Sequence, residues 1–225
     1  MGDYGDAYRG SRARLTALAN DLDDGTLAKT VPTCPDWRVK DVYGHLIGLV
    51  ADVAAGNLEG AGSDPWTQKQ VDDRAHHSRA ELIAEWDSNG PGIEEMLDGV
   101  PPAVGAQIVG DIAAHEMDVY GAVGRTDGRD SDAIALGFQR YATALGTRIK
   151  EAGLPPLRLK TPEDDLVAGD GMAEAEVAAS RFELFRALTG RRSADQVRAL
   201  QWNGDAAPYV AIFSAYGVPT APVVE

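Results

Sequence analysis

The apolar residues of the first 152 positions recur at helical spacing. In the segment 130–152 they stand at steps of three or four residues: Ile134, Phe138, Tyr141, Leu145 and Ile149. This spacing places the apolar side chains on one face of an α-helix, which must pack against another element. The same pattern predicts helices at residues 4–22, 37–56, 66–76, 78–97 and 104–123. Short polar breaks separate them, so we expect an antiparallel helical bundle.

The pattern changes at Gly153-Leu154-Pro155-Pro156. Short apolar runs bounded by turn residues follow at 157–159 and 166–168, and they predict strands. We expect a helix at 176–188, and Ser193 as the N-cap of a short helix after it. The apolar residues of the tail, 208–225, indicate that it packs. The sequence therefore predicts a helical domain at 1–153 and a small α+β domain at 154–225.

Composition narrows the function classes. Lys and Arg number 21 and Asp and Glu number 35, which gives a net charge of 21 − 35 = −14. A chain this acidic is not expected to bind nucleic acid or an anionic membrane surface. No apolar run is long enough to span a bilayer, and the first residues lack the features of a signal peptide. With a single cysteine, Cys34, the chain is expected to be a cytoplasmic protein without a disulfide framework.

The histidines include two candidates for a metal site. His115 lies in the predicted helix 104–123, with Asp111 four residues before it and Asp118 three after. Residues four apart share a helix face, so Asp111 and His115 can present an oxygen and a nitrogen to one ion. His45 from the helix 37–56 would complete a set of two histidines and one carboxylate. Three protein ligands leave one position open, as in catalytic zinc sites.

The spacing also allows a plainer interpretation. Acidic residues are so frequent here that many helical histidines have one nearby, and Asp41 lies four residues before His45. Both histidines could instead be hydrogen-bonded at the edge of the core. His76 and His77 lie among charged residues and are expected at the surface.

Three other features carry possible chemistry. Cys34 precedes a helix, where a thiolate is favoured, but we expect it to be a small buried residue between two prolines. Trp37 is expected to pack at the start of its helix. Arg191 and Arg192 form a concentrated pair of cations in this acidic chain. They could bind an anionic substrate or cofactor, or complement the end of the preceding helix.

Three segments in order resemble motifs of the mycothiol-dependent maleylpyruvate isomerase-like family, within the DinB/YfiT-like metalloenzyme superfamily. The segment Val31–Leu46, with Cys34, Trp37 and His45, resembles the first histidine motif. Asp111-x-x-x-His115-x-x-Asp118 is similar to the second metal motif. Leu188–Ser193 looks like the glycine–arginine segment near the C-terminus.

The resemblance implies a mainly α fold, an up-and-down four-helix bundle followed by a small α/β domain. It implies a divalent metal, usually zinc, bound by His45, Asp111 and His115. It also implies a low-molecular-weight thiol, which is mycothiol in actinobacterial members, used for isomerisation or S-transfer. Arg191 would correspond to the arginine that these isomerases need for activity.

Two departures separate this chain from the characterised isomerase. That enzyme has glutamate at the position of Asp111, and an arginine shortly before it is replaced here by the stretch 108–110. Aspartate is one methylene shorter, so its helix must come closer to the ion. The resemblance therefore supports the fold and the metal site more strongly than it supports maleylpyruvate as the substrate.

These observations combine into one expected function with alternatives. The expected protein is a zinc- and thiol-dependent isomerase or S-transferase acting on a small electrophilic, anionic substrate, as a monomer or homodimer. Arg191 would bind an anionic group, Asp118 would orient His115, and Asp41 is an alternative partner for His45. The residues that contact the thiol are not identified. A metal- or ligand-binding module without turnover, a zinc–water hydrolase and a bare structural bundle remain alternatives.

Overall fold

The computed structural model describes residues 4–225. The first three residues, part of the segment from which no signal peptide is expected, lie outside the described residues. The chain forms two compact units, one reaching to Asp127 together with Glu225, and one from Gly128 to Val224. The structure is mainly α-helical, with a helical bundle followed by a small α/β part, which confirms the predicted fold class.

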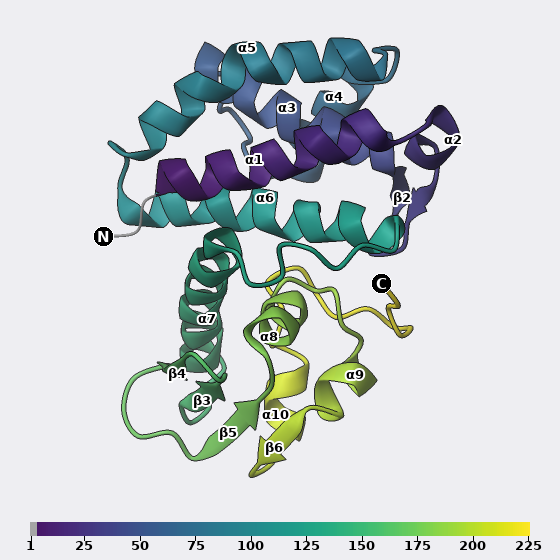
Figure 1. The fold of residues 1–225 in the computed structure, drawn as a ribbon. Coiled ribbons are helices and arrows are strands. Elements are labelled where there is room, and N and C mark those ends of the chain that lie inside the picture. Colours follow the sequence, from purple (N-terminus) through teal and green to yellow (C-terminus); the bar gives the residue numbers. More distant parts are fainter. Residues whose placement is uncertain (1–3) are drawn as a thin grey trace. The chain divides into compact units, whose positions relative to one another are not determined.

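The first unit is a four-helix bundle with short additions (Figure 1). The helices that pack into the bundle are α1 (Tyr4–Asp21), α3 (Val39–Ala55), α5 (Arg79–Leu97) and α6 (Pro102–Ala122). Between α1 and α3 lie α2 (Asp24–Leu27) and an antiparallel pair of strands, β1 (Thr30–Val31) and β2 (Cys34–Arg38). The helix α4 (Asp64–Arg74) packs against α3.

Aromatic and charged side chains stabilise the packing of the bundle helices. Trp86 of α5 is fully buried, and its indole N–H donates to the hydroxyl of Tyr8 on α1 at 3.3 Å. Glu116 of α6 is also fully buried and pairs with Arg14 of α1, with Nε–Oε1 at 2.5 Å and Nη2–Oε2 at 2.9 Å. The buried carboxylate thus fixes α6, which carries His115, against α1.

The entry into α3 differs from the expectation. The helix begins at Val39, and residues 34–38 form a strand beside β1 instead of starting the helix at Trp37. The Asp41 carboxylate accepts from the backbone N–H of Arg38 at 2.8 Å and so satisfies a free donor of the first turn. Pairing with a neighbouring strand therefore decides where this helix starts.

The second unit combines helices with a four-stranded sheet. Its elements are α7 (Asp132–Glu151), β3 (Leu157–Lys160), β4 (Asp165–Ala168), β5 (Ala175–Ala178), α8 (Arg181–Leu188), α9 (Ala194–Arg198), β6 (Gln201–Asn203) and α10 (Ala207–Val210). The strand order is β4-β3-β5-β6, with β3 and β5 parallel and the outer pairs antiparallel. The sheet buries Leu157, Leu159 and Val177, and the expected packing of the tail is seen in Phe213, which is fully buried.

The prediction of a helix at 176–188 is wrong for residues 176–180. Residues 175–178 form β5, and α8 begins only at Arg181, where Ser180 caps it by accepting from the backbone N–H of Glu183. The alanine- and glutamate-rich stretch favours a helix by local propensity. Hydrogen bonds to β3 and β6 on either side override that propensity.

Along the chain, the division between the two compact units follows Asp127, whereas the sequence predicted a domain boundary at residue 153. The helix α7 accounts for the difference, because it packs against α8 and β4 of the second unit.

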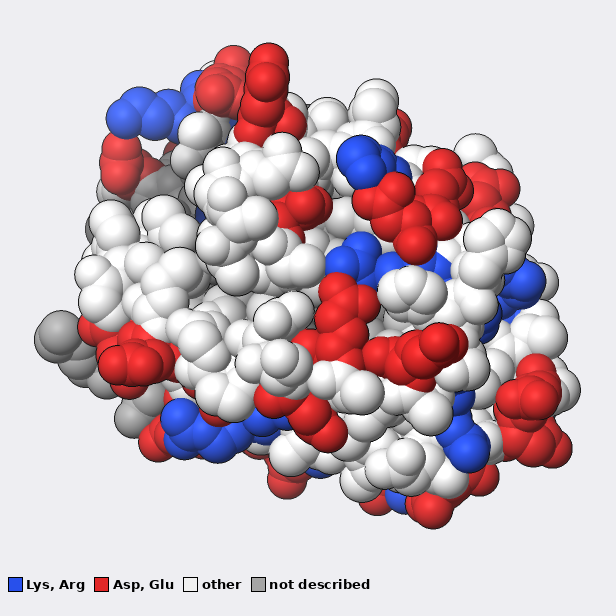
Figure 2. Space-filling model, turned by 90° about the horizontal axis from the view of Figure 1, so that it is seen from above, with Lys and Arg blue, Asp and Glu red and all other residues white. Residues whose placement is uncertain are grey.

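Among the described residues, no helix combines the length and apolar character needed to cross a bilayer. On the face seen in Figure 2, acidic side chains are spread widely, with basic side chains between them.

Candidate metal centre

The structure brings His45, Asp111 and His115 together inside the first unit. His45 comes from α3, and the other two lie one turn apart on α6. Nε2 of His45 lies 3.4 Å from Asp111 Oδ2, and Nε2 of His115 lies 3.8 Å from Asp111 Oδ1. One donor atom from each residue lies within 4.8 Å of the others.

These separations fit a small divalent ion. Zinc binds imidazole nitrogen and carboxylate oxygen at about 2.1 Å, so two ligands of a tetrahedral site lie about 3.4 Å apart. The histidine–aspartate separations of 3.4 and 3.8 Å are close to that value. Two imidazoles and one carboxylate are also a donor set that zinc accepts. The residues present therefore fit the group that the sequence implies.

A side chain from α4 occupies the far side of His45. Gln70, which is buried, places its Oε1 2.8 Å from His45 Nδ1, and its Nε2 donates to Asp52 Oδ2 at 2.7 Å. Sequence reasoning missed Gln70, because it is 25 residues from His45 and lies on another helix. One residue in the sequence hinted at a closely packed neighbour, namely Gly48, one turn after His45. A Cβ at Gly48 would come within 2.5 Å of Gln70 Cβ, so a larger residue there would push Gln70 away.

A carboxylate occupies the far side of His115. Asp118 Oδ2 lies 3.0 Å from His115 Nδ1, and Asp118 also accepts from Thr33 Oγ1 at 2.7 Å and from Cys34 Sγ at 3.5 Å. Burial lowers the pKa of His115, and the nearby carboxylates of Asp118 and Asp111 only partly oppose this. The imidazole is therefore neutral near pH 7, which is the form that binds metals.

An indole covers the two imidazoles. The ring centre of Trp37 lies 5.2 Å from that of His45 and 5.8 Å from that of His115. The two imidazoles themselves are 4.9 Å apart and nearly perpendicular. Trp37 thus forms a wall of the candidate site, whereas the sequence suggested only that it packs at the start of its helix.

Two expectations are corrected by the geometry. The Asp41 carboxylate pairs with the Arg38 guanidinium at 2.8 Å and not with the His45 ring, whose two nitrogens face Gln70 and Asp111. Cys34 is half-buried and bonded to Asp118, so it is more than a small apolar residue in a loop. Cys34, His115 and Asp118 also form a second group of potential ligands, in which Asp118 already accepts from Cys34 Sγ and lies 3.0 Å from His115 Nδ1.

The other histidines lie away from this group. His76 is exposed, as expected. His77 is half-exposed, with Nδ1 at 3.8 Å from Glu85 Oε2. Neither belongs to a group of potential metal ligands among the described residues.

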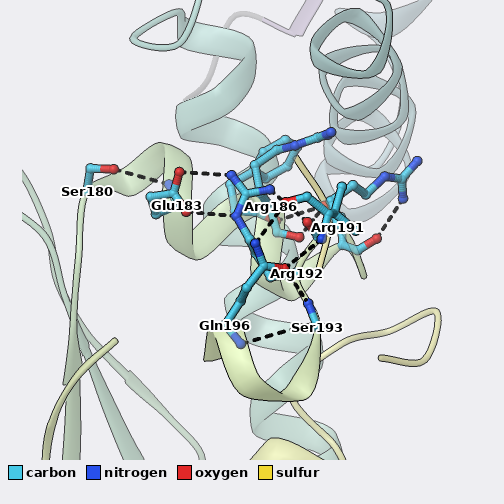
Figure 3. A network of polar contacts seen from close by, with 10 residues as sticks. Ser180, Glu183, Arg186, Arg191, Arg192, Ser193 and Gln196 are labelled. Carbon is cyan, nitrogen blue, oxygen red and sulfur yellow. Dashed lines mark hydrogen bonds and ion pairs between the residues drawn. The ribbon is translucent and has the colours of Figure 1, made fainter. Parts of the chain in front are cut away.

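Arg191 belongs to the second unit. It follows Gly190, is 8% exposed, and donates from Nη1 to the carbonyl of Thr189 at 2.6 Å. Beside it, Arg192 makes a bidentate pair with Glu183, with Nε–Oε2 at 2.8 Å and Nη2–Oε1 at 2.9 Å (Figure 3). The two arginines are therefore built into the fold at the end of α8.

Gly190 allows that segment to close. Its φ of +79° lies in the left-handed region, and a Cβ on it would come within 2.9 Å of Ser214 Oγ and 3.0 Å of the Gly217 carbonyl oxygen. Glycine tolerates both constraints because it has no side chain. The turn that presents Arg191 thus depends on this residue.

The bundle and its converging donors define the class: a helical protein with a candidate divalent-metal site made of two histidines and one aspartate. A family model, the mycothiol maleylpyruvate isomerase N-terminal domain, matches residues 8–126. The chain belongs to this family. That match spans the bundle except the first turn of α1, and it includes the three donors.

A solved structure shares the fold over most of the chain. It is the crystal structure of a histidine-to-alanine mutant of mycothiol-dependent maleylpyruvate isomerase, with a TM-score of 0.59 and 11% sequence identity. The alignment covers 89% of this chain and 91% of that one. The search of curated proteins gave no match.

Proposed function

We propose that this protein is a zinc-dependent enzyme that acts on a small electrophilic anion with mycothiol or a similar low-molecular-weight thiol. It would either isomerise the anion or attach the thiol to it through sulfur. One observation carries the proposal: Nε2 of His45 and Nε2 of His115 lie 3.4 and 3.8 Å from the Asp111 carboxylate oxygens, and one donor atom of each residue lies within 4.8 Å of the others. Membership of the family supports the thiol. A reducing cytoplasm, in which a free thiol and Cys34 persist, is the compartment that suits it.

His45, Asp111 and His115 would hold the ion and leave a fourth position open. A divalent metal there would supply positive charge that stabilises a thiolate near neutral pH. Asp118 would keep the His115 ring in place through Nδ1, leaving Nε2 to face the ion. Trp37 would exclude water from one side of the two imidazoles and strengthen electrostatic interactions there.

Arg191 would bind an anionic group of the substrate or the thiol. A guanidinium suits a carboxylate because its N–H donors match the two oxygens. In an isomerisation the thiolate sulfur bonds to one carbon of a conjugated double bond, and the π electrons of that bond shift onto the conjugated carbonyl. The resulting single bond rotates, and the electrons then return to restore the double bond as the C–S bond breaks and releases the thiolate. In a transfer the C–S bond persists in the product, because the neighbouring carbon takes up a proton before the sulfur can leave.

Maleylpyruvate is the first substrate to test, because the solved neighbour is a maleylpyruvate isomerase. Asp111 in place of glutamate, and the absence of an arginine at 108–110, favour a different small electrophile. A panel of conjugated carboxylic acids and a generic thiol acceptor therefore belongs in the same assay.

Metal binding is tested first. Protein purified without a histidine tag is expected to contain one equivalent of metal, and added zinc should raise its melting temperature. The double variant His45→Ala/His115→Ala should lose both effects, whereas Asp118→Ala should keep the stoichiometry. Wild-type protein that neither contains nor binds a metal would refute the proposed site.

Turnover is tested next with the metal-loaded protein. Mycothiol with each electrophile should react faster than with the metal-depleted protein, and Arg191→Gln should raise KM for the anionic substrates. Metal binding without acceleration for any thiol would instead indicate a binding module. Acceleration by water alone would indicate a hydrolase.

A further inference from the structure

Gln70 and Asp52 form a short hydrogen-bonded chain that ends on His45. His45 Nδ1 and Gln70 Oε1 are 2.8 Å apart, and Gln70 Nε2 donates to Asp52 Oδ2 at 2.7 Å. The first contact is fully inside the protein, because both His45 and Gln70 are buried. We propose that Gln70, oriented by Asp52, is a positioning residue that fixes the tautomer of His45; this rests on the metal site of the proposed function.

The direction of each hydrogen bond follows from chemistry. A carboxylate can only accept, so the Asp52 oxygen requires the NH₂ end of the Gln70 amide to face it. The amide oxygen then faces His45, and an oxygen can only accept. Nδ1 of His45 therefore carries the proton, and Nε2 keeps its lone pair on the side of Asp111.

Without this chain the opposite tautomer would compete. Asp111 Oδ2 lies 3.4 Å from His45 Nε2, close enough to attract a proton on Nε2. A protonated Nε2 has no lone pair for a metal. Gln70 thus gives His45 a proton location that leaves its metal-binding nitrogen free.

The backbone is built to bring Gln70 to this place. Gly48 of α3 meets Gln70 of α4 so closely that a Cβ would come within 2.5 Å of Gln70 Cβ. Gly44, one turn earlier, lies with its Cβ position 3.7 Å from Val71 Cα. Small residues on this face of α3 therefore let α4 approach the helix that carries His45.

The two histidines thus have unlike outer partners. His115 faces the Asp118 carboxylate, whereas His45 faces a neutral amide whose orientation is set by a more distant carboxylate. An exchange of the two groups in the chain to His45 should preserve its direction. In Asp52→Asn/Gln70→Glu, the carboxylate at 70 accepts from His45 and from the amide at 52.

The experiment compares wild type, Gln70→Leu, Asp52→Asn, Gly48→Ala and the exchanged double variant. Nitrogen NMR of the imidazoles in metal-free protein reports the tautomer, and competition with a chromophoric chelator reports zinc affinity. Lys69→Met, an exposed neighbour on α4, is the control. Circular dichroism and thermal unfolding verify that each variant is folded.

In wild type we expect His45 protonated at Nδ1. Gln70→Leu should move the proton toward Nε2 and weaken zinc binding about 10- to 100-fold. Gly48→Ala should weaken zinc binding with all donors intact, Asp52→Asn should have a smaller effect, and the exchanged variant should recover affinity. A folded Gln70→Leu protein with wild-type tautomer and zinc affinity would overturn the inference, while a wild type that binds no zinc would refute the proposed function instead.

Discussion

Asp118 lies 3.0 Å from Nδ1 of His115, on the same helix and less than one turn further along. The same carboxylate accepts from Thr33 and Cys34, so two hydrogen bonds hold it beside the His115 ring. This arrangement orients the ring with its other nitrogen toward Asp111. A carboxylate behind a metal-binding imidazole also makes that imidazole a stronger ligand.

Asp118→Asn should therefore weaken zinc binding without abolishing it. A neutral amide of the same shape accepts the His115 proton less strongly, and we expect a loss of about 10- to 100-fold in affinity. Chelator competition measures this, with Asp127→Asn as a control because Asp127 is exposed and pairs with Arg125. Equal affinities for the two variants would contradict the role of Asp118.

Gly190→Ala should destabilise the turn that presents Arg191. The left-handed φ of +79° costs a residue with a Cβ about 1–2 kcal/mol, and contacts of 2.9 and 3.0 Å add strain. Gly153→Ala is a matched control, with φ +66° and no atom within 4 Å of the added Cβ. Thermal unfolding should show a larger loss for Gly190→Ala; equal losses would mean that the close contacts relax without cost.

Arg14→Met should destabilise the bundle by about 3–5 kcal/mol at neutral pH, because it leaves the Glu116 carboxylate buried without its partner. Burial already raises the pKa of Glu116, although Arg14 opposes the shift. Denaturant unfolding measures the loss. Adding Glu116→Gln should recover part of the lost stability, and no recovery would show that packing by Arg14, not its charge, is what matters.

Glu183→Gln should change how stability depends on pH. Burial alone would raise the pKa of Glu183, but Arg192, with Arg129 and Arg186, outweighs it and holds the pKa below its ordinary value of 4.5. A lowered pKa means that the pair contributes stability fully above about pH 4.5, and that this is lost as pH falls through the lower folded value.

The melting temperature of Glu183→Gln should accordingly fall below that of wild type at pH 7 and approach it below pH 4. Thermal unfolding across this pH range provides the measurement. Glu176→Gln, which alters a carboxylate 3.9 Å from Arg158 on the sheet, is the control. A gap that stays constant with pH would exclude the ion pair as its cause.

Most of the long helices follow from local pattern. The spacing of apolar residues predicts α1, α3, α5, α6 and α7 to within a few residues, because an amphipathic helix carries its own periodicity. The same periodicity brings Asp111 and His115 to one face, since they are four apart on a helix. Pattern fails at 175–178, where local propensity favours a helix but pairing with two strands decides.

The sequence by itself determined the class of fold and the acidic composition, because these depend on residue content and on spacing along single elements. Spacing on one helix also brought Asp111 and His115 to a common face, and the family resemblance added His45 from another helix. Tertiary structure decided what lies behind His45, whereas Asp118 behind His115 follows from spacing on one helix. Asp41 is four residues from His45, yet it bonds to the first turn of its own helix, and Gln70 from α4 takes the place beside His45. Gln70 comes from a distant segment of the chain. It reaches His45 only because α3 and α4 approach each other closely, which the absence of a side chain at Gly48 permits.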